Sequence, residues 1–302
     1  MKITVLLGGP SDERPVSLVS GAAVAAGLRA MGHEVLESDI APDNLAALDQ
    51  PADVIFPVLH GQFGEDGQLQ QILEQRNLPF VGSGSQASRI AMDKVATKEA
   101  WQRAGLPTAP WEIVSRQAPT PTHTKAPCVV KPIASGSSID IEICQTDGQV
   151  HRACEKLLKK YESVLVEKFV KGIELTVGIL QQQPLPPIRI TTSREFYDYQ
   201  AKYQGGTEYH FDLNIPDEVA RQAQELGVRA HEVLGCRDLS RVDMIVDAQM
   251  QPWLLEINTL PGFTPRSLLP KAAGRIGVDF NQLVDRLARS ALDRHLAGAA
   301  CS

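Results

Sequence analysis

The sequence predicts an α/β unit followed by α+β units. Near the N-terminus, apolar segments of strand length alternate with segments of helical periodicity, a pattern typical of a parallel sheet covered by helices. Further along, several short strand-like segments surround one helical segment, which favours a small antiparallel sheet. With 302 residues, 43% of them hydrophobic, the chain is long enough for two or three cores.

The first unit is expected at residues 1–93. Strands are predicted at residues 3–7, 34–39 and 54–59, and helices at residues 15–31 and 67–76. Pro15 suits the first position of its helix, and Gly32 ends it. Gly8-Gly9 and His60-Gly61 directly follow predicted strands. Because ligands of parallel sheets gather at the carboxyl ends of strands, these two loops are expected to line a site.

The second unit is expected at residues 94–180 and the third at residues 181–302. A helix is predicted at residues 94–105. It is followed by predicted strands at residues 128–131, 139–144, 164–169 and 174–180, around a helix at residues 148–161. Prolines at 184, 186 and 187 interrupt the pattern, and the third unit ends in a predicted helix at residues 281–296.

Composition and charge narrow the class of protein. The formal net charge of −6 comes without any long basic run, so nucleic acid and anionic membranes are poor partners. Five cysteines without a Cys-x-x-Cys spacing predict free thiols in a reducing compartment. No apolar run approaches the roughly 20 residues that span a membrane, and the N-terminus lacks a signal-peptide core. A soluble cytoplasmic enzyme is expected.

The strongest site signal lies near the C-terminus, in Arg241-Val242-Asp243 and Glu256-Ile257-Asn258. Both segments are predicted strands, and side chains two residues apart on a strand share a face. If the two strands are neighbours, Asp243 joins Glu256 and Asn258 in an all-oxygen cluster of the kind that Mg²⁺ prefers. Arg241 adds a cation on the same face, as phosphoryl transfer requires. A solvated polar strand face is the alternative interpretation.

Two further segments are compatible with a nucleotide. Lys131 ends a predicted strand and precedes the loop at residues 135–138, whose backbone N–H groups can approach phosphate oxygens. An ordinary polar loop is the alternative. Glu167, Lys168 and Glu174 bracket a turn after another predicted strand. That turn can offer backbone groups to adenine and a carboxylate to ribose, and a surface ion pair explains it equally well.

Three other segments are candidates for parts of a pocket. The loop at residues 197–203 carries three tyrosines, which favours a lid or a substrate wall over a folded-back structural loop. His60 precedes a predicted helix N-terminus, where anions bind, although a lone histidine is more often structural than catalytic. Asp12 and Glu13 precede the first helix, where capping explains an acidic residue without any ligand.

Short motifs follow one another in a fixed order along nearly the whole chain. They are Leu6-Leu7-Gly8-Gly9 with Glu13 and Val16-Ser17, His60-Gly61 with Gly64-Glu65-Asp66-Gly67, Met92-Asp93-Lys94, Lys131-Pro132, Gly136-Ser137-Ser138, Glu167-Lys168, residues 197–203, Arg241-Val242-Asp243, and residues 256–262 with Ser267-Leu268. In this order and spacing they resemble the D-alanine–D-alanine ligases of the ATP-grasp superfamily. The resemblance implies an N-terminal parallel α/β domain followed by central and C-terminal α+β domains that enclose the nucleotide.

The resemblance also implies a reaction, in which the carboxylate of a first D-alanine attacks the γ-phosphate of ATP. The amine of a second D-alanine then attacks the resulting acyl phosphate. The implied nucleotide ligands are Lys94, Lys131, Ser137, Glu167, Lys168, Val170 through its backbone, Glu174, Lys202 and Asn258. The implied ligands of two Mg²⁺ or Mn²⁺ ions are Asp243, Glu256 and Asn258.

The substrate contacts implied by the resemblance surround the two amino acids. Glu13 would hold the first amine, with Val16, Ser17 and His60 nearby, and Ser267 with Leu268 would hold the second carboxylate. Arg241 and the Gly262 N–H would stabilise the oxyanion, and Glu13, Ser137 and Tyr203 would form a hydrogen-bonded set beside the amine. A homodimer is implied as well.

Two departures from the family pattern bear on these expectations. The family usually has a glutamate where Ser135 stands and a glycine where Asp140 stands, and Pro265-Arg266 before Ser267 is unusual. A D-alanine–D-lactate or D-alanine–D-serine ligase is the nearest rival, although residues 200–203 keep the dipeptide-type pattern. A catalytically silent ATP-binding protein is a rival of another class, which an intact set of Asp243, Glu256 and Asn258 disfavours.

Overall fold

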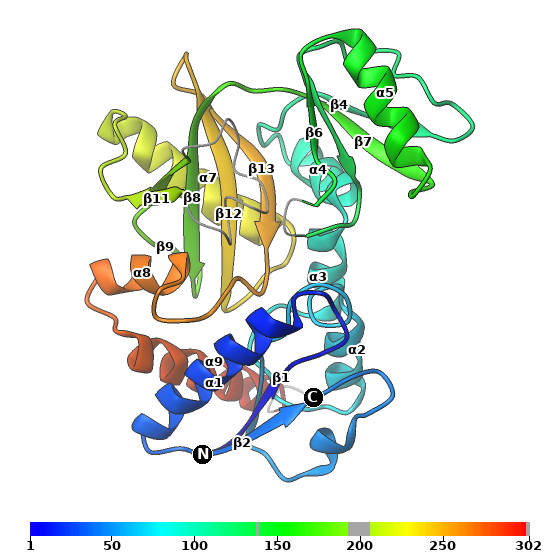
Figure 1. Cartoon of the computed structure of the whole chain (residues 1–302). Coiled ribbons are helices and arrows are strands. Elements are labelled where there is room, and N and C mark those ends of the chain that lie inside the picture. The colour runs from blue at the N-terminus through cyan, green and yellow to red at the C-terminus, as the bar shows by residue number, and fades with distance from the viewer. Residues whose placement is uncertain (137–138, 193–205, 300–302) are drawn as a thin grey trace.

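A three-stranded parallel sheet forms the N-terminal part of the chain (Figure 1). Its strands are β1 (Lys2–Leu7), β2 (Glu34–Asp39) and β3 (Val54–Pro57), in the order β2-β1-β3. The connecting elements are α1 (Arg14–Ala30), the short 3-10 helix η1 (Ala46–Asp49) and α2 (Gln68–Gln75). The predicted parallel α/β unit is thus confirmed. The computed structural model describes residues 1–136, 139–192 and 206–299.

The core of this sheet is completed by the far end of the chain. The last helix, α9 (Phe280–Ala299), packs against α1 and β3, and Val284 and Leu287 share a core with Ile3 and Val24. All four side chains are fully buried or nearly so, and burying them stabilises the sheet by the hydrophobic effect. A helix at residues 281–296 was predicted, but its place against the N-terminal sheet was not.

Two consecutive helices, α3 (Ser85–Met92) and α4 (Lys94–Arg103), leave the N-terminal unit. Asp93 lies between them, and its carboxylate accepts hydrogen bonds from the Val95 and Ala96 N–H groups at 2.9 Å. This cap satisfies two of the backbone donors that a helix start leaves unpaired. The helix at residues 94–105 was predicted, whereas α3 was not.

A small antiparallel sheet follows, with the strand order β4-β7-β5-β6. Its strands are β4 (Trp111–Ser115), β5 (Cys128–Pro132), β6 (Glu142–Cys144) and β7 (Ser163–Lys168), and α5 (Asp147–Leu158) covers one face. Cys128, Cys144 and Cys154 lie buried in the core between them as free thiols, as expected. The predicted small antiparallel unit is confirmed, with β4 as an additional strand.

The largest sheet has six strands in antiparallel pairs. Its path is β11 (Thr207–His210), β10 (Ile188–Thr192), β8 (Gly172–Leu180), β12 (Leu239–Asp247) and β13 (Pro252–Asn258), and β9 (Gln183–Pro184) pairs with β8. β8 was expected beside the other strands of residues 94–180. It pairs instead with β10 and β12, so the two sheets are divided between β7 and β8.

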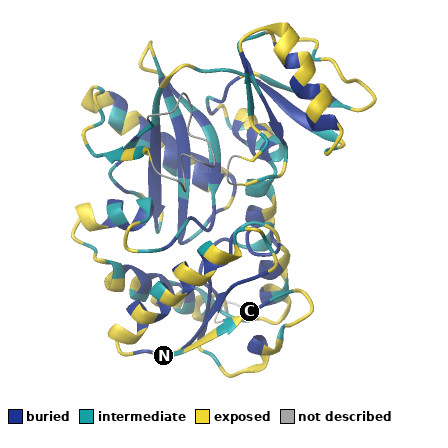
Figure 2. Cartoon of the chain, viewed as in Figure 1, coloured by how far each residue is buried: buried dark blue, intermediate teal, exposed yellow. Residues whose placement is uncertain are grey.

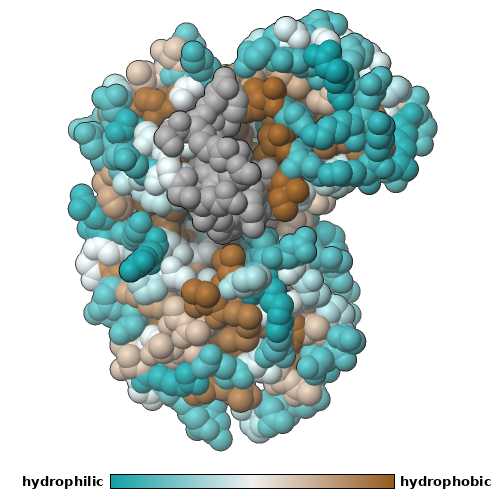
Figure 3. Space-filling view, viewed as in Figure 1, coloured by the Kyte–Doolittle hydropathy of each residue, from teal (hydrophilic) through white to brown (hydrophobic). Residues whose placement is uncertain are grey.

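One face of the large sheet packs against α7 (Asp217–Val233), which lies behind the strands in Figure 1. Figure 2 shows that the strands are mostly buried, whereas the outer helix surfaces are exposed. Figure 3 shows hydrophobic surface gathered near the middle of the side of the molecule in view and mostly hydrophilic surface over α5. Within the described residues, no helix is long and apolar enough to cross a membrane.

Candidate active site

The polar cluster expected on two strands forms on one face of the large sheet. β12 and β13 pair antiparallel, with Asp243 opposite Glu256 and Arg241 opposite Asn258. Directly opposite residues share a face, so the four side chains lie on the same side of the sheet. The intervening Val242 and Ile257 point the other way and are buried against α7. The conditional prediction that the two strands are neighbours is confirmed.

Asp243 is held firmly from two sides. Arg241 donates from Nε at 3.0 Å to Oδ1 and from Nη2 at 2.9 Å to Oδ2, and Thr176 on β8 donates to Oδ1 at 2.6 Å. Planar guanidinium matches a carboxylate with two parallel hydrogen bonds, which fixes the geometry of both groups. Glu174, two residues before Thr176 on β8, lies on the same face of the sheet.

The chemistry of this donor set fits a hard cation. Asp243, Glu256 and Asn258 offer only carboxylate and amide oxygens, and the Asn258 oxygen already accepts from the Leu260 N–H at 3.0 Å. No three His, Cys, Asp or Glu side chains of the described residues come together as a possible metal site. The set therefore depends on an asparagine as its third member.

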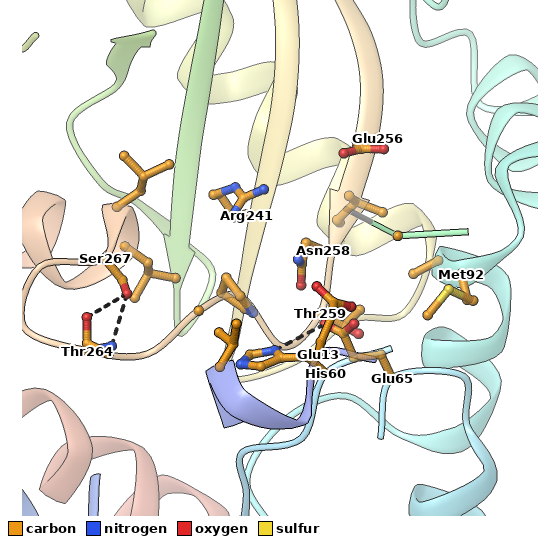
Figure 4. A pocket seen from close by; sticks show the side chains of 18 of the residues that line it. Glu13, His60, Glu65, Met92, Arg241, Glu256, Asn258, Thr259, Thr264 and Ser267 are labelled. Atoms are coloured by element: carbon orange, nitrogen blue, oxygen red, sulfur yellow. Dashed lines mark hydrogen bonds and ion pairs between the residues drawn. The ribbon is translucent and has the colours of Figure 1, made fainter. Parts of the chain in front are cut away.

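A cavity of about 310 Å³ lies between this sheet face and the N-terminal unit. Figure 4 shows Arg241, Glu256 and Asn258 on the strand side and Glu13, His60 and Glu65 across from them. The cavity lining includes ten residues that were assigned to the site from the sequence: Glu13, Val16, His60, Lys94, Arg241, Glu256, Asn258, Gly262, Ser267 and Leu268. Segments far apart in the sequence thus converge on one cavity.

Glu13 stands at the start of α1 but does not cap it. Its side chain makes no capping hydrogen bond to the helix, so the capping interpretation is wrong for this residue. The carboxylate lies beside two glycine loops instead. A Cβ built on Gly61 would be 3.1 Å from Oε2 of Glu13, and one built on Gly136 would be 3.4 Å from it. Gly61 also has φ +70°, so a side chain there would be both crowded and strained.

His60 is buried at the bottom of the cavity. Its Nδ1 lies 3.0 Å from the Leu260 carbonyl and 3.9 Å from Glu65, whose other oxygen accepts from the Gly61 N–H at 2.7 Å. Burial opposes protonation of His60, yet the carboxylates of Glu65 and Glu13 outweigh it and raise its pKa. His60 thus connects the loop after β3 with the turn after β13.

The turn after β13 leads into α8 (Leu268–Arg275), which begins at the cavity. Ser267 precedes the helix, and its Oγ accepts from the Thr264 N–H and contacts the Thr264 hydroxyl, both at 3.0 Å. Backbone N–H groups at a helix start attract anions. Gly262 and the start of α8 at Leu268 line the cavity, whereas the Ser267 N–H already donates to the Thr264 carbonyl at 3.0 Å.

Lys94 lies where the N-terminal helices meet the loop after β5. Its ammonium donates to the Ser135 carbonyl at 2.6 Å, and its N–H donates to the Ile133 carbonyl at 3.1 Å. At the other end of the loop, Asp140 adopts a positive φ of +56°. Asp140 accepts hydrogen bonds from Tyr161 at 2.8 Å and from Lys160 at 3.0 Å, which tie this end to the region after α5.

Lys131 and Glu167 form a buried pair on neighbouring strands of the small sheet. Lys131 Nζ lies 2.5 Å from one carboxylate oxygen, and Lys98 Nζ lies 2.7 Å from the other. Burial raises the pKa of Glu167, but the two ammonium groups outweigh it and lower that pKa to about 2. Lys98 was missed in the sequence, where a lysine among polar helix residues looks solvated.

Several expected residues lie outside the cavity. Ser17 is fully buried, donating to the Val58 carbonyl at 2.6 Å and accepting from the Gly8 N–H at 2.9 Å, so it holds two loops together. Lys168 ends β7, Val170 follows this strand, and Glu174 lies on β8, all partly buried. They lie on the connection from β7 of the small sheet to β8 of the large sheet. Ser137, Lys202 and Tyr203 lie outside the described residues.

The fold and this site define an ATP-grasp enzyme. Residues 100–289 match the family model described as the D-ala D-ala ligase C-terminus, and residues 38–83 match the N-terminus model. The chain belongs to the D-alanine–D-alanine ligase family.

Similar proteins cover almost the full length. The D-alanine–D-alanine ligase of Gloeobacter violaceus is 41% identical over 303 aligned positions, covering 97% of this chain and 100% of that relative. The enzyme of Syntrophotalea carbinolica is 42% identical, covering 95% and 94%. A crystal structure of the Bacillus anthracis ligase matches with a TM-score of 0.88 at 31% identity and 99% coverage of both chains. A second, complexed with ATP, has a TM-score of 0.85, 29% identity and the same coverage.

Proposed function

We propose that this chain joins two D-alanines into D-alanyl-D-alanine, with conversion of ATP to ADP and phosphate. The observation that carries the proposal is the single cavity that brings Glu13, Arg241 and Lys94 together. A carboxylate suits the amine of a first amino acid, a guanidinium suits a developing oxyanion, and an ammonium suits phosphate. Each of these groups comes from a different part of the chain. The product would supply peptidoglycan synthesis in the cytoplasm.

The two amino acids are proposed to lie between the N-terminal unit and α8. Glu13 would hold the first amine, beside Val16 and His60, while Ser267 and the start of α8 would hold the second carboxylate. As the second amine attacks, negative charge grows on the carbonyl oxygen between Arg241 and the Gly262 N–H. Preorganised donors at such a position typically contribute ~10²–10³ in rate.

The nucleotide is proposed to lie between the small and large antiparallel sheets, reached by Lys94, Lys131 and the turn at residues 167–174. Ser137, Lys202 and Tyr203 belong to the same proposal. Asp243, Glu256 and Asn258 would hold two Mg²⁺ or Mn²⁺ ions, which supply charge neutralisation to the phosphates when bound. Arg241 would then orient Asp243 from one side while facing the reacting carbonyl from the other.

Units at residues 1–93, 94–180 and 181–302 and a homodimeric assembly complete the proposal, with the last strand of the second unit, β8, joining the sheet of the third. Each unit contributes to the cavity or to its borders, so no single unit would be active alone. The assembly is tested by light scattering of the purified protein, where a mass of one chain would contradict the dimer.

Phosphate release with D-alanine, D-lactate and D-serine as second substrates tests the reaction. We expect ATP-dependent release with D-alanine alone and D-alanyl-D-alanine as the main product at neutral pH. Hydroxyl groups are weaker nucleophiles, and a site arranged for one hydrogen-bonding group can reject its analogue by factors up to ~10⁴. Depsipeptide as the main product would favour the D-alanine–D-lactate rival, and no release with any substrate would favour a silent ATP-binding protein.

A further inference from the structure

A buried cluster of three charged side chains lies behind the proposed phosphate site. Its members are Lys98 on α4, Lys131 on β5 and Glu167 on β7, and their side chains are 0%, 7% and 4% exposed. Two ammonium groups share one carboxylate, so the cluster carries one surplus positive charge. Removing an uncompensated charge from water is unfavourable, so the surplus charge needs a physical reason.

Among the described residues, Glu167 is the only anionic partner that the structure gives to the two lysines. Lys131 pairs with Glu167, and Lys98 pairs with Glu167 and donates to the Thr108 hydroxyl at 2.5 Å. A role in packing alone would be better served by an apolar side chain, since replacing buried ions by apolar groups is often neutral or stabilising. The arrangement suits a site that binds a polyanion.

Lys98 also links the parts of the chain that surround this site. It lies four residues after Lys94, and residues at this spacing occupy the same side of a helix. Lys94 contacts the loop after β5, whereas Lys98 reaches β7 through Glu167. Through Thr108, which donates to the Leu254 carbonyl at 3.1 Å, Lys98 connects to β13 two residues before Glu256.

We infer that Lys98 is a positioning residue, which occupies Glu167 so that the Lys131 ammonium remains available to the phosphates of ATP. This inference rests on the proposed function, because it assumes that Lys131 binds phosphate. Without Lys98, Glu167 and Lys131 form a neutral pair, and the phosphates must compete with a buried carboxylate for that ammonium. With Lys98 in place, the carboxylate is shared, and the phosphates restore charge balance.

The test compares ligands with and without phosphates on Lys98→Met, which keeps most of the length of the side chain but removes its charge. We expect the dissociation constant of a non-hydrolysable ATP analogue with Mg²⁺ to rise about tenfold, the effect of losing one charge-assisted hydrogen bond. The dissociation constant of adenosine should stay within twofold. Equal weakening of both ligands would indicate a structural role and overturn the inference, as would unchanged binding of both.

Two further variants separate the electrostatic role from packing. Lys98→Met/Glu167→Gln removes the competing carboxylate, so analogue binding should recover most of the loss; a double variant as weak as Lys98→Met would contradict the inference. Thr108→Val is the matched control, because it removes a hydrogen bond from Lys98 but leaves the ammonium on Glu167. Its analogue binding should stay within twofold, and a tenfold loss there would assign the effect to packing.

The same measurements distinguish this inference from the proposed function. If the unmodified protein binds the analogue but releases no phosphate with D-alanine, the proposed ligation is wrong. The dissociation constants of the Lys98 variants still test the role of Lys98 in that case. Should Lys98→Met not fold, both ligands are measured on Lys98→Gln, which is also uncharged, and the same outcomes apply.

Discussion

Two buried carboxylates, Asp238 and Glu167, each lie beside two cationic side chains, yet their surroundings differ. Asp238 binds Arg294 and accepts from the Gly82 N–H at 2.7 Å. The two arginines near it also donate hydrogen bonds to backbone carbonyls. Arg294 donates to Phe80 at 2.8 Å, and Arg237 donates to Gly82 at 2.7 Å. None of these residues lines the cavity.

Glu167 has lysines where Asp238 has arginines. A guanidinium carries five hydrogen-bond donors in a rigid, planar arrangement. The arginines around Asp238 use these donors to connect the end of the N-terminal unit with the start of β12. An ammonium is a compact charge with three donors on a flexible stem. We infer that this charge pattern serves structure where the backbone fixes the cations, as at Asp238, and suits a ligand where it does not, as proposed for Lys131 beside Glu167.

The largest expected effect is on turnover and concerns Arg241, an arginine that is fixed by Asp243 but lines the cavity. Arg241→Lys should lower kcat by ~10²–10³, because a lysine cannot hold Asp243 with two parallel bonds and face the oxyanion as well. Steady-state phosphate release at saturating D-alanine measures it. Arg237→Lys is the control, with unchanged kcat in the folded protein. Near-normal turnover of Arg241→Lys would contradict a role of Arg241 in stabilising the oxyanion.

The next effect is on stability and concerns Asp238. Asp238→Ala should lower the free energy of unfolding by about 3 kcal/mol, because it leaves a partly buried guanidinium without its carboxylate. Urea unfolding measures this loss, and KM for ATP should be unchanged. Asp49→Ala, which removes the exposed partner of Arg76, should cost less than about 1 kcal/mol. Equal losses for the two variants would show that the burial of Asp238 contributes nothing.

The smallest expected effect is on the pH dependence of stability and concerns Glu167. The pKa of Glu167 lies at about 2 in the folded protein against an ordinary 4.5, so its ionisation stabilises the fold above pH 4.5. That contribution is lost as the pH falls from 4.5 towards 2. The difference in unfolding free energy between the unmodified protein and Glu167→Gln should therefore shrink across this window. A difference that stays constant from pH 6 to pH 3 would mean that Glu167 is not held ionised by its lysines.

Much of the fold could be predicted because the local patterns are strong. The strands β1 and β3 belong to nearly continuous apolar runs that end in glycine loops, and the alternation of Arg241, Val242 and Asp243 fixes which face of β12 is polar. The partner of a strand is a different matter. Gly172–Leu180 has the composition of a strand in either antiparallel sheet, and only its long-range pairing with β12 decides the outcome.

The candidate site was predictable where several polar residues share a short motif, and not where a single residue acts through a distant partner. Lys98 lies in a polar helix whose sequence shows no reason for burial, and its carboxylate comes from a strand in another sheet. Ser17 presents the opposite case. Its hydroxyl was expected to contact the substrate. In the structure it donates to the Val58 carbonyl and accepts from the Gly8 N–H instead.

The packing of α9 against the N-terminal sheet has a consequence for synthesis on the ribosome. β1 emerges well before residues 283–291, which complete its core. At roughly 5–20 residues per second, the nascent sheet waits tens of seconds without its cover. During that interval its apolar surface is open to chaperones and to other nascent chains. Expression yield should therefore depend on temperature and chaperone supply more than the folded enzyme's own stability suggests.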